Sequence, residues 1–495
     1  MSITHPPKDH RWLALAVVGL AQLMVVLDST IVNIALPSAQ ADLGFSNDNR
    51  TWIVTAYSLA FGSLLLLGGR LSDIFGRKTT FIIGLLGFAA ASALGGAADG
   101  FGLLVTARAL QGAFGALLAP SALGILTTTF SEPKERSKAF GIFGAIAGSG
   151  AAVGLLLGGV LTEYTSWRWC LFVNVLFAIV AVIGSFVFLR KSAPAAVKPR
   201  VDVPGVLAVT LGLFGIVYGF SNAETNGWSA PLTIICLAGG VVLLAVFVLL
   251  QARVSHPLLP LRIVLNRDRG GAYIVLALIS IGMFAAFLFL TYYLTGTLGY
   301  SSLKTGFAFL PMPLSIMFTA TIVGARLLPV VGPRILVFIG GLVAAVGMGL
   351  LTRTALDSGY AAVVLPALIV MGLGLGLIFS SAMNIATAGV SREDAGVASA
   401  TVNTMQQIGG SIGTALLSTL SASAVTAYLT SHGTSKLDQA NATLSGYHLA
   451  FGISAGIFVI VAIIGGTLIE RHSVRKARVA DSSAEAADDV PVMAH

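Results

Sequence analysis

A single carboxylate lies deep within the first long apolar segment of the sequence. Asp28 belongs to residues 27–37, which read Leu-Asp-Ser-Thr-Ile-Val-Asn-Ile-Ala-Leu-Pro. A charge at the centre of a spanning helix costs about 2.5 to 3.5 kcal/mol on insertion scales, so a neighbouring group must compensate it. Intramembrane carboxylates mark proton relays in pumps and transporters. We therefore expect Asp28 to bind and release a proton; the alternative is a structural ion pair or a carboxylate satisfied by local backbone.

Arg108 is the expected counter-charge. At 1.5 Å per residue, a first helix that ends near Leu36 places Asp28 about 12 Å below the outer boundary. A fourth helix that starts near Phe101 places Arg108 about 10 Å below the same boundary. Gln111 follows one turn later on the same face. The pair is predicted to perform proton coupling, with a purely structural role for Arg108 as the alternative.

Several polar side chains inside other apolar segments are candidates for a substrate cavity. A polar group in a membrane helix either lines such a cavity or bonds a neighbouring helix, and both readings stay open for most of them. The candidate cavity residues are Asn33, Tyr57, Gln111, Asn384, Asn403 and Gln406.

The composition indicates the kind of element that carries these groups. Of the 495 residues, 56% are hydrophobic and 10% are charged, whereas soluble domains carry about 25% charged residues. The chain is therefore predicted to be an all-α polytopic membrane protein. Fourteen apolar segments could span a bilayer: 12–36, 52–69, 79–98, 101–126, 139–161, 169–189, 205–221, 231–252, 271–292, 303–325, 335–352, 360–387, 396–424 and 447–469.

The distribution of basic residues predicts the orientation. With the N-terminus placed in the cytoplasm, the inner loops and tails hold 23 of the 29 Lys and Arg residues, and the outer loops hold 5. This bias follows the positive-inside rule and places both termini in the cytoplasm. The net charge of +8 thus reflects topology, and no nucleic-acid partner is expected, because the basic residues are scattered among short loops.

Two loop sequences indicate an internal repeat. Residues 69–78, Gly-Arg-Leu-Ser-Asp-Ile-Phe-Gly-Arg-Lys, share Arg, Leu, Gly and a final base in register with residues 325–334. Two parallel six-helix repeats with a site between them are the build of major facilitator transporters. We therefore predict that fold, with two inserted helices. The expected parts are a cytoplasmic tail (1–11), an N-terminal repeat (12–189), an inserted pair with flanking loops (190–270), a C-terminal repeat (271–470) and a disordered cytoplasmic tail (471–495).

A run of glycines marks the fifth apolar segment as a close-packing helix. Residues 148–154 imitate a dinucleotide-binding fingerprint, but no strand precedes them, so cofactor binding is rejected. The two cysteines and seven histidines offer no disulfide framework or metal-ligand spacing. We expect no metal and no cofactor, with a proton gradient as the energy source. The glycines assigned to helix packing are Gly144, Gly148, Gly154, Gly158 and Gly159.

Four motifs resemble the major facilitator superfamily, specifically the fourteen-span drug:proton antiporters of the EmrB/QacA type. They are residues 27–37 in helix 1, 69–78 in the loop after helix 2, Arg108 with Gln111 and Gly112 in helix 4, and 144–159 in helix 5, where Leu155 replaces the usual Pro. Trp167-Arg168-Trp169 and Asn174 also resemble the start of the family's helix 6. The resemblance implies a bacterial cytoplasmic membrane and a conformational latch between the halves, formed by Gly69, Arg70, Asp73, Gly76, Arg77 and Lys78.

The predicted function is export of amphipathic drugs, dyes or secondary metabolites by proton-coupled antiport and alternating access. The expected partners are small neutral or weakly cationic substrates, protons and membrane lipid, and the protein is expected to be a monomer. The main alternative is a proton-coupled metabolite symporter of the same fold. An enzyme is not expected, because no cluster of acids, bases or metal ligands lies near one surface.

Overall fold

The computed structural model describes residues 8–130, 133–189, 202–254, 257–320, 325–387, 390 and 395–470. These residues form helices and their connections, with no β-strand among them. Eleven helices of the described part are long and apolar enough to cross a membrane. Two longer helices contain shorter apolar stretches, Trp52–Leu65 and Val153–Tyr164. The all-helical prediction is thus confirmed.

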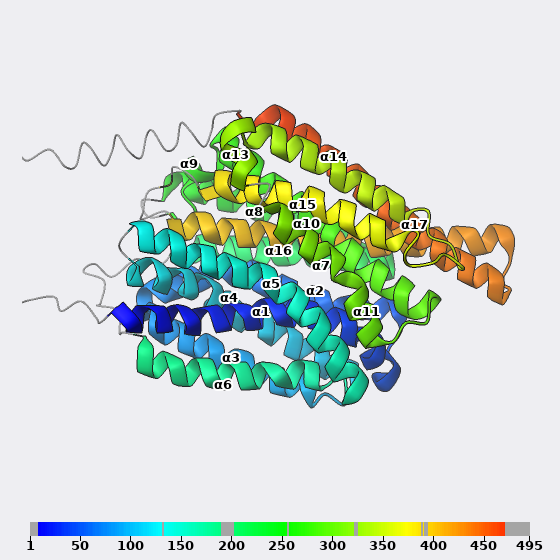
Figure 1. The fold of residues 1–495 in the computed structure, drawn as a ribbon, viewed down its shortest axis with the longest axis horizontal. Helices are drawn as coiled ribbons and strands as arrows, with labels where there is room; N and C mark the ends of the chain where they lie inside the picture. Colours follow the sequence, from blue (N-terminus) through cyan, green and yellow to red (C-terminus); the bar gives the residue numbers. More distant parts are fainter. Residues whose placement is uncertain are drawn as a thin grey trace, which may run out of the picture.

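The first six helices form the first set. They run antiparallel along one long axis of the molecule (Figure 1). Their bounds are α1 Lys8–Leu43, α2 Asn47–Phe75, α3 Arg77–Gly96, α4 Phe101–Thr129, α5 Pro133–Tyr164 and α6 Trp169–Phe188. We call the end at which α1 begins the inner end, and the end at which α1 stops the outer end.

The helices after residue 202 continue the bundle. Two of them, α7 Val203–Asn226 and α8 Pro231–Arg253, are followed by the single turn α9 Leu261–Val264. The remaining helices form the second set: α10 Arg267–Tyr292, the π-turn η1 Tyr293–Thr297, α11 Ser302–Phe309, α12 Pro311–Phe318, α13 Ala325–Val331, α14 Pro333–Leu351, α15 Val364–Thr387, α16 Ala395–His432 and α17 Lys436–Leu468.

The two sets pack their helices in matching pairs. In the first set α4 contacts α1, α2 and α3, while α6 contacts α1 and α3, and α5 contacts α1. In the second set α15 contacts α10, α12 and α14, while α17 contacts α10 and α14, and α16 contacts α10. Each pair of the first set therefore has a counterpart at the equivalent position of the second.

The two sets meet along two seams. At one seam α2 packs against α16, and at the other α5 packs against α11 and α12. Helix α7 lies beside the first seam and contacts both α2 and α16. The hydroxyl of Thr210 on α7 donates a hydrogen bond to the carbonyl of Ser63 on α2, at 3.1 Å. Helix α7, with α8 packed against it, thus covers a seam without separating the two sets.

The segment expected as one span at 303–325 is divided. Helix α11 ends at Phe309 and α12 begins at Pro311. Pro311 and Pro313 have no N–H, so two hydrogen bonds of a continuous helix cannot form there. Residues 321–324, which belong to the same expected span, lie outside the described residues.

Helices α16 and α17 extend beyond the segments that hydropathy selected. They project past the other helices at the outer end as an antiparallel hairpin (Figure 1). Gly433 adopts a φ of +107°, which suits glycine at the turn, and Ser435 and Asp438 form a capping box at the start of α17. Hydropathy selects the apolar core of a span, whereas these signals determine where the helices end.

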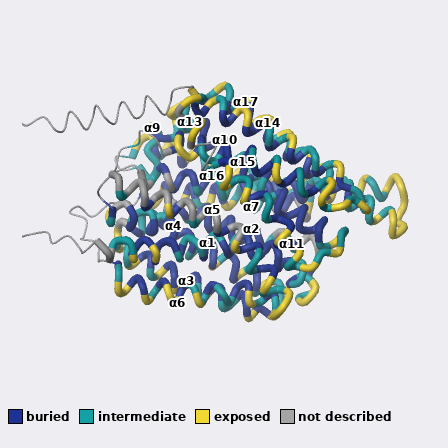
Figure 2. The backbone as a smooth tube through the Cα atoms, viewed as in Figure 1, coloured by how far each residue is buried: buried dark blue, intermediate teal, exposed yellow. Residues whose placement is uncertain are grey.

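Exposed residues recur along the outward faces of the helices (Figure 2). Large aliphatic side chains are exposed along α6 and α8, which in a soluble protein would form an unusually large apolar patch. Such faces are compatible with lipid. They include Leu176, Ile179, Val180, Ile183, Ile234, Ile235, Val241, Val242 and Leu249.

Candidate functional site

An ion pair between Asp28 and Arg108 lies inside the first set. Nη1 of Arg108 on α4 is 2.6 Å from Oδ2 of Asp28 on α1. The side chains are 2% and 0% exposed, respectively. In such a dry environment neither charge could persist alone, because the desolvation penalty amounts to several kcal/mol per ion. The structure thus brings together the two residues assigned to proton coupling.

Three further side chains complete the environment of the carboxylate. Oδ1 of Asp28 accepts hydrogen bonds from Nε2 of Gln111 at 2.9 Å and from Nδ2 of Asn174 at 2.7 Å. Gln111 also accepts a bond from Arg108 at 2.9 Å and donates to Oγ of Ser92 at 2.7 Å. We call Asp28, Arg108, Gln111, Asn174 and Ser92 the charge cluster.

Two members of the charge cluster were not assigned a role from the sequence. In the sequence, Asn174 on α6 only resembles a residue of the family's helix 6, and Ser92 on α3 carries no motif. Both are fully buried. The only local signal was the presence of a polar side chain within an apolar segment. Oδ1 of Asn174 is itself buried and has no hydrogen-bond partner among the described residues.

Arg108 is also connected to α2. Its Nε donates to the carbonyl of Ile53 at 3.3 Å, and its guanidinium carbon lies 4.4 Å from the centre of the Tyr57 ring, within the range of a cation–π contact. Tyr57 was expected in the substrate cavity; the structure places its ring beneath Arg108, with 2% of the residue exposed. A displacement of Arg108 would therefore change its contacts with α2.

Small residues permit the close approach of the helices that carry the charge cluster. A Cβ atom on Gly112 of α4 would collide with the carbonyl of Tyr57 on α2. On α5, Cβ atoms at Gly150, Gly154 and Gly158 would meet α1, for example 3.1 Å from the carbonyl of Leu27 in the case of Gly154. Helix α5 thus packs its glycine face directly against the helix of Asp28.

Of the other glycines assigned to helix packing, only Gly159 has described surroundings. Gly159 faces α11, where an added Cβ would lie 2.7 Å from Cα of Leu303. Gly144 and Gly148 lie within α5, but their surroundings are outside the described side chains. Leu155, which replaces the family's proline, is fully buried in an uninterrupted helix.

Two of the remaining cavity candidates, Asn33 and Asn384, bond to the backbone of their own helices. Asn33 is buried and donates to the carbonyl of Ser29, one turn earlier. Asn384 is exposed and donates to the carbonyl of Ser380. Asn403 and Gln406 are half-buried on α16, a helix of the seam with α2. Their assignment to a substrate cavity stays a prediction.

The predicted latch residues lie at the junction of α2 and α3, at the inner end. Gly76, with a φ of +88°, ends α2 and precedes α3. Nη1 of Arg77 donates to the carbonyl of Gly124 on α4 at 2.8 Å, and Lys78 donates to the carbonyl of Leu189 after α6 at 2.5 Å. Both bonds stay within the first set.

The other predicted latch residues lie near the end of α2. Gly69 and Arg70 are half-buried there, and the side chain of Asp73 lies outside the described ones.

A cation–π contact at the outer end joins the two sets. The guanidinium of Arg50 on α2 lies 3.2 Å from the centre of the Tyr292 ring on α10. Nη1 of Arg50 also donates to Oε1 of Gln40 on α1 at 3.0 Å. These residues border a cavity that Pro37, Thr295, Gly296 and Tyr447 also line. We call the pair Arg50 and Tyr292 the outer contact.

The charge cluster contains one carboxylate paired with one guanidinium. Within the described residues, no group of three His, Cys, Asp or Glu side chains could hold a metal ion. A buried carboxylate with one counter-cation, inside a bundle of apolar helices with lipid-compatible faces, defines a polytopic membrane protein of the solute-transporter class.

The comparisons with known proteins agree with this class. A family model described as Major Facilitator Superfamily matches residues 18–414. The puromycin resistance protein pur8 of Streptomyces alboniger is 49% identical over 485 residues, covering 98% of this chain and 94% of that protein. The cephamycin export protein CmcT of Amycolatopsis lactamdurans is 37% identical over 419 residues, covering 83% and 85%, respectively.

Solved structures share the fold. A bacterial homolog of the human lysosomal transporter Spinster, crystallised in an inward-facing and unoccupied conformation, has a TM-score of 0.65 at 15% identity, covering 96% of this chain and 99% of that chain. The chain belongs to the major facilitator superfamily. It is a multi-pass protein of the cytoplasmic membrane and a transporter in kind, not an enzyme.

Proposed function

We propose that the protein exports amphipathic antibiotics or related compounds in exchange for protons. The observation that carries the proposal is the buried Asp28, held by Arg108, Gln111 and Asn174 at 2.6 to 2.9 Å. A carboxylate with one nearby cation changes the net charge of its surroundings when it binds a proton. The similarity to the puromycin resistance and cephamycin export proteins supports export as the direction.

In this proposal, protonation of Asp28 weakens its ion pair with Arg108. When Asp28 is neutral, the ion pair of 2.6 Å loses its attraction, while Arg108 keeps its bonds to Gln111 and to the carbonyl of Ile53. Because the guanidinium also lies over Tyr57, its displacement would be transmitted to α2, a helix of the seam with α16. Protonation would thereby favour one orientation of the two sets over the other.

Alternating access follows from the two sets moving against each other. In this proposal the first set (12–189) and the second set (271–470) are the moving bodies, and the pair within 190–270 is an insertion beside one seam. The matching helix pairs of the two sets support it. The proposed topology has fourteen spans with both termini in the cytoplasm, as in the drug:proton antiporters of the EmrB/QacA type, and a monomer as the working unit.

The energetics favour neutral or weakly cationic substrates. One pH unit supplies about 1.36 kcal/mol per proton and 100 mV about 2.3 kcal/mol per charge. A neutral compound exchanged for one proton can use both, whereas a monovalent cation exchanged one for one moves no net charge. The described part holds one deeply buried ion pair of this kind, which fits a single coupled proton.

Substrate-induced proton movement tests the proposal directly. Inverted vesicles energised to be acid inside would receive puromycin, cephamycin and a panel of lipophilic dyes, with a pH-sensitive fluorophore in the lumen. We expect at least one compound to dissipate the gradient with the wild-type protein and not with Asp28→Asn. Asp357→Asn, which alters an exposed carboxylate, is the matched control.

The outcomes separate the alternatives. If Asp28→Asn couples as well as the wild type, Asp28 is a structural residue and the proposal fails. If a compound instead moves together with protons down the gradient, the protein is a symporter.

A further inference from the structure

Two carboxylates lie on one stripe of α1. Asp28 and Asp42 are 14 residues apart, which is close to four helical turns, so they share a face and are separated by about 21 Å along the axis. Val32, Ala35 and Ala39 occupy the stripe between them. All three are buried, and Asp42 has a side-chain exposure of 51%. One helix face thus connects an exposed acid at the outer end with the buried acid of the charge cluster.

A narrow cavity follows this stripe. Its walls are formed by α1, α2, α4 and the start of α6, all of the first set, and we call it the slot. Its volume is about 10 Å³, and its walls are apolar apart from Arg108, so it must widen before it admits a chain of water molecules. The residues that define its course are Val32, Ala35 and Ala39 on α1, Arg108 on α4, and Trp167 and Cys170 at α6.

The slot reaches the charge cluster at its inner end. Arg108 forms part of its wall, and Nη1 of that residue lies 2.6 Å from Oδ2 of Asp28. Asp28 itself does not line the slot, and the guanidinium of Arg108 lies between the slot and Oδ2 of the carboxylate. When Arg108 moves, water in the slot gains contact with the acid.

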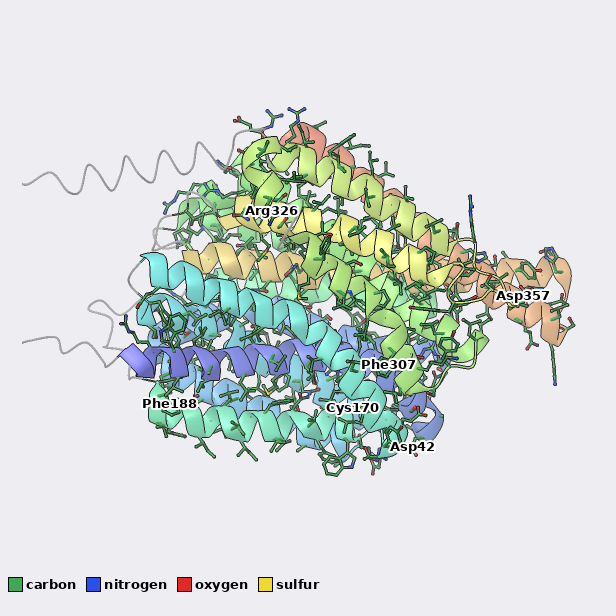
Figure 3. All side chains as sticks on the ribbon, in the orientation of Figure 1. Asp42, Cys170, Phe188, Phe307, Arg326 and Asp357 are labelled. Carbon is green, nitrogen blue, oxygen red and sulfur yellow. The ribbon has the colours of Figure 1, made fainter. Side chains whose placement is uncertain are left out.

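Trp167 closes the outer end. Its side chain is a wall of the slot, and its Nε1 donates a hydrogen bond to Oδ2 of Asp42 at 3.0 Å. The same carboxylate oxygen pairs with Nη2 of Arg168 at 3.2 Å. In Figure 3, Asp42 lies at the outer end of the bundle and Cys170 lies further in. The indole is thus held as a lid by an acid that solvent can reach.

We propose that the slot is the route by which protons from the outer side reach Asp28, with Trp167 as its gate. The inference rests on the proposed proton coupling. A hydronium ion at Asp42 passes its proton to water admitted to the slot, and the last water gives a proton to Asp28, forming its O–H bond and leaving neutral water behind. None of the residues that line the slot belongs to the second set. The proton therefore enters within one set, while the substrate leaves between the two sets.

The size of the side chains on the stripe gives the first test. Ala39→Leu adds three carbon atoms at the wall of the slot, and Ala41→Leu adds them on the exposed face of the same helix. We expect Ala39→Leu to slow substrate-induced proton movement about tenfold, because the added atoms occupy the slot. Exchange of labelled for unlabelled substrate, which needs no proton, should stay at the wild-type rate, and Ala41→Leu should resemble the wild type in both assays.

Cys170 gives a second test that does not depend on transport. It lines the slot and is buried, and Cys236 on α8 is the other thiol. In a Cys236→Ser background, methyl methanethiosulfonate applied from the outer side should modify Cys170 slowly. Trp167→Ala should raise that rate about tenfold by removing the lid, and adding Ala39→Leu to Trp167→Ala should reduce the rate again.

The results distinguish the route from the coupling. If the wild type moves no protons on addition of substrate, or Asp28→Asn still couples, the proposed function and the route both fail. If Asp28→Asn abolishes coupling but Ala39→Leu couples at the wild-type rate, the route is wrong and the coupling stands. Labelling of Cys170 that is unaffected by Trp167→Ala also overturns the route.

Discussion

At the scale of single residues, the charge cluster depends on the shape of Arg108 as much as on its charge. The guanidinium contacts Asp28, Gln111, the carbonyl of Ile53 and the ring of Tyr57 simultaneously. A lysine ammonium is a point charge without this planar fork. It could keep the ion pair, but could not reach all four partners from one position.

We therefore expect Arg108→Lys to insert into the membrane but to lose coupling. Proton movement per substrate should fall at least tenfold, since losing hydrogen bonds to a charged group costs about 1.5 to 3 kcal/mol each. The measurement is the vesicle assay with substrate binding recorded in parallel. Arg326→Lys, at an exposed arginine, is the control. Unchanged coupling in Arg108→Lys would show that charge alone suffices.

Asn174 is expected to respond to the proton. Its Nδ2 donates to the charged carboxylate, while its Oδ1 has no partner among the described residues. Rotation of the amide would let Oδ1 accept a hydrogen bond from a protonated Asp28. Asn174→Leu removes both options at similar volume. The C=O stretching band of protonated Asp28, recorded by infrared difference spectroscopy, should move to higher frequency, and a band that stays in place would exclude this contact.

At the scale of elements, the position of Asp28 depends on the packing of α1 against α5. A Cβ atom at Gly154 would meet Oγ1 of Thr30 and lie 3.1 Å from the carbonyl of Leu27. We expect Gly154→Ala to destabilise the protein by about 1 to 3 kcal/mol, the usual cost of overpacking. It should also reduce export, because α1 carries Asp28.

Thermal unfolding in detergent measures the first effect. Gly239→Ala is the matched control, since Gly239 lies on an exposed part of α8 with nothing within 4 Å of an added Cβ. Alanine there should be neutral or slightly stabilising, because glycine is the poorer helix former. Equal unfolding temperatures for both variants would contradict the packing argument.

At the scale of the whole molecule, the outer contact favours the conformation described here. Arg50 and Tyr292 belong to different sets, so their cation–π contact must break if the outer ends separate. Such contacts contribute about 0.5 to 2 kcal/mol, enough to change the ratio of two conformations severalfold. The second seam adds close packing, because a Cβ atom at Gly306 would lie 2.5 Å from the carbonyl of Leu155.

We expect Tyr292→Leu to increase the population with separated outer ends. Spin labels at the exposed positions 41 and 437, one on each set, would report the distance between the sets by pulsed electron resonance. The longer distance should gain weight in Tyr292→Leu. Tyr164→Leu, at an exposed tyrosine outside the contact, should leave the distribution unchanged. An unaltered distribution in Tyr292→Leu would remove the outer contact from the mechanism.

The all-helical architecture and the common depth of Asp28 and Arg108 could be predicted from the sequence. Both follow from quantities that are local along the chain: the length of an apolar run, the cost of a charge within it, and a fixed rise per residue. Helix ends were less well predicted, as at α16 and α17, because caps and turns rather than hydropathy set them.

Which polar residues contact one another depends on how the helices pack in the tertiary structure. Asn174 lies 146 residues from Asp28 in sequence and donates to it at 2.7 Å, while Asn33, only five residues away, bonds to the backbone of its own helix. The slot between α1, α2, α4 and the start of α6 is likewise a property of packing. Hydrophobic burial is non-directional, so sequence patterns place a side chain inside the bundle, but the contacts between helices select its partners.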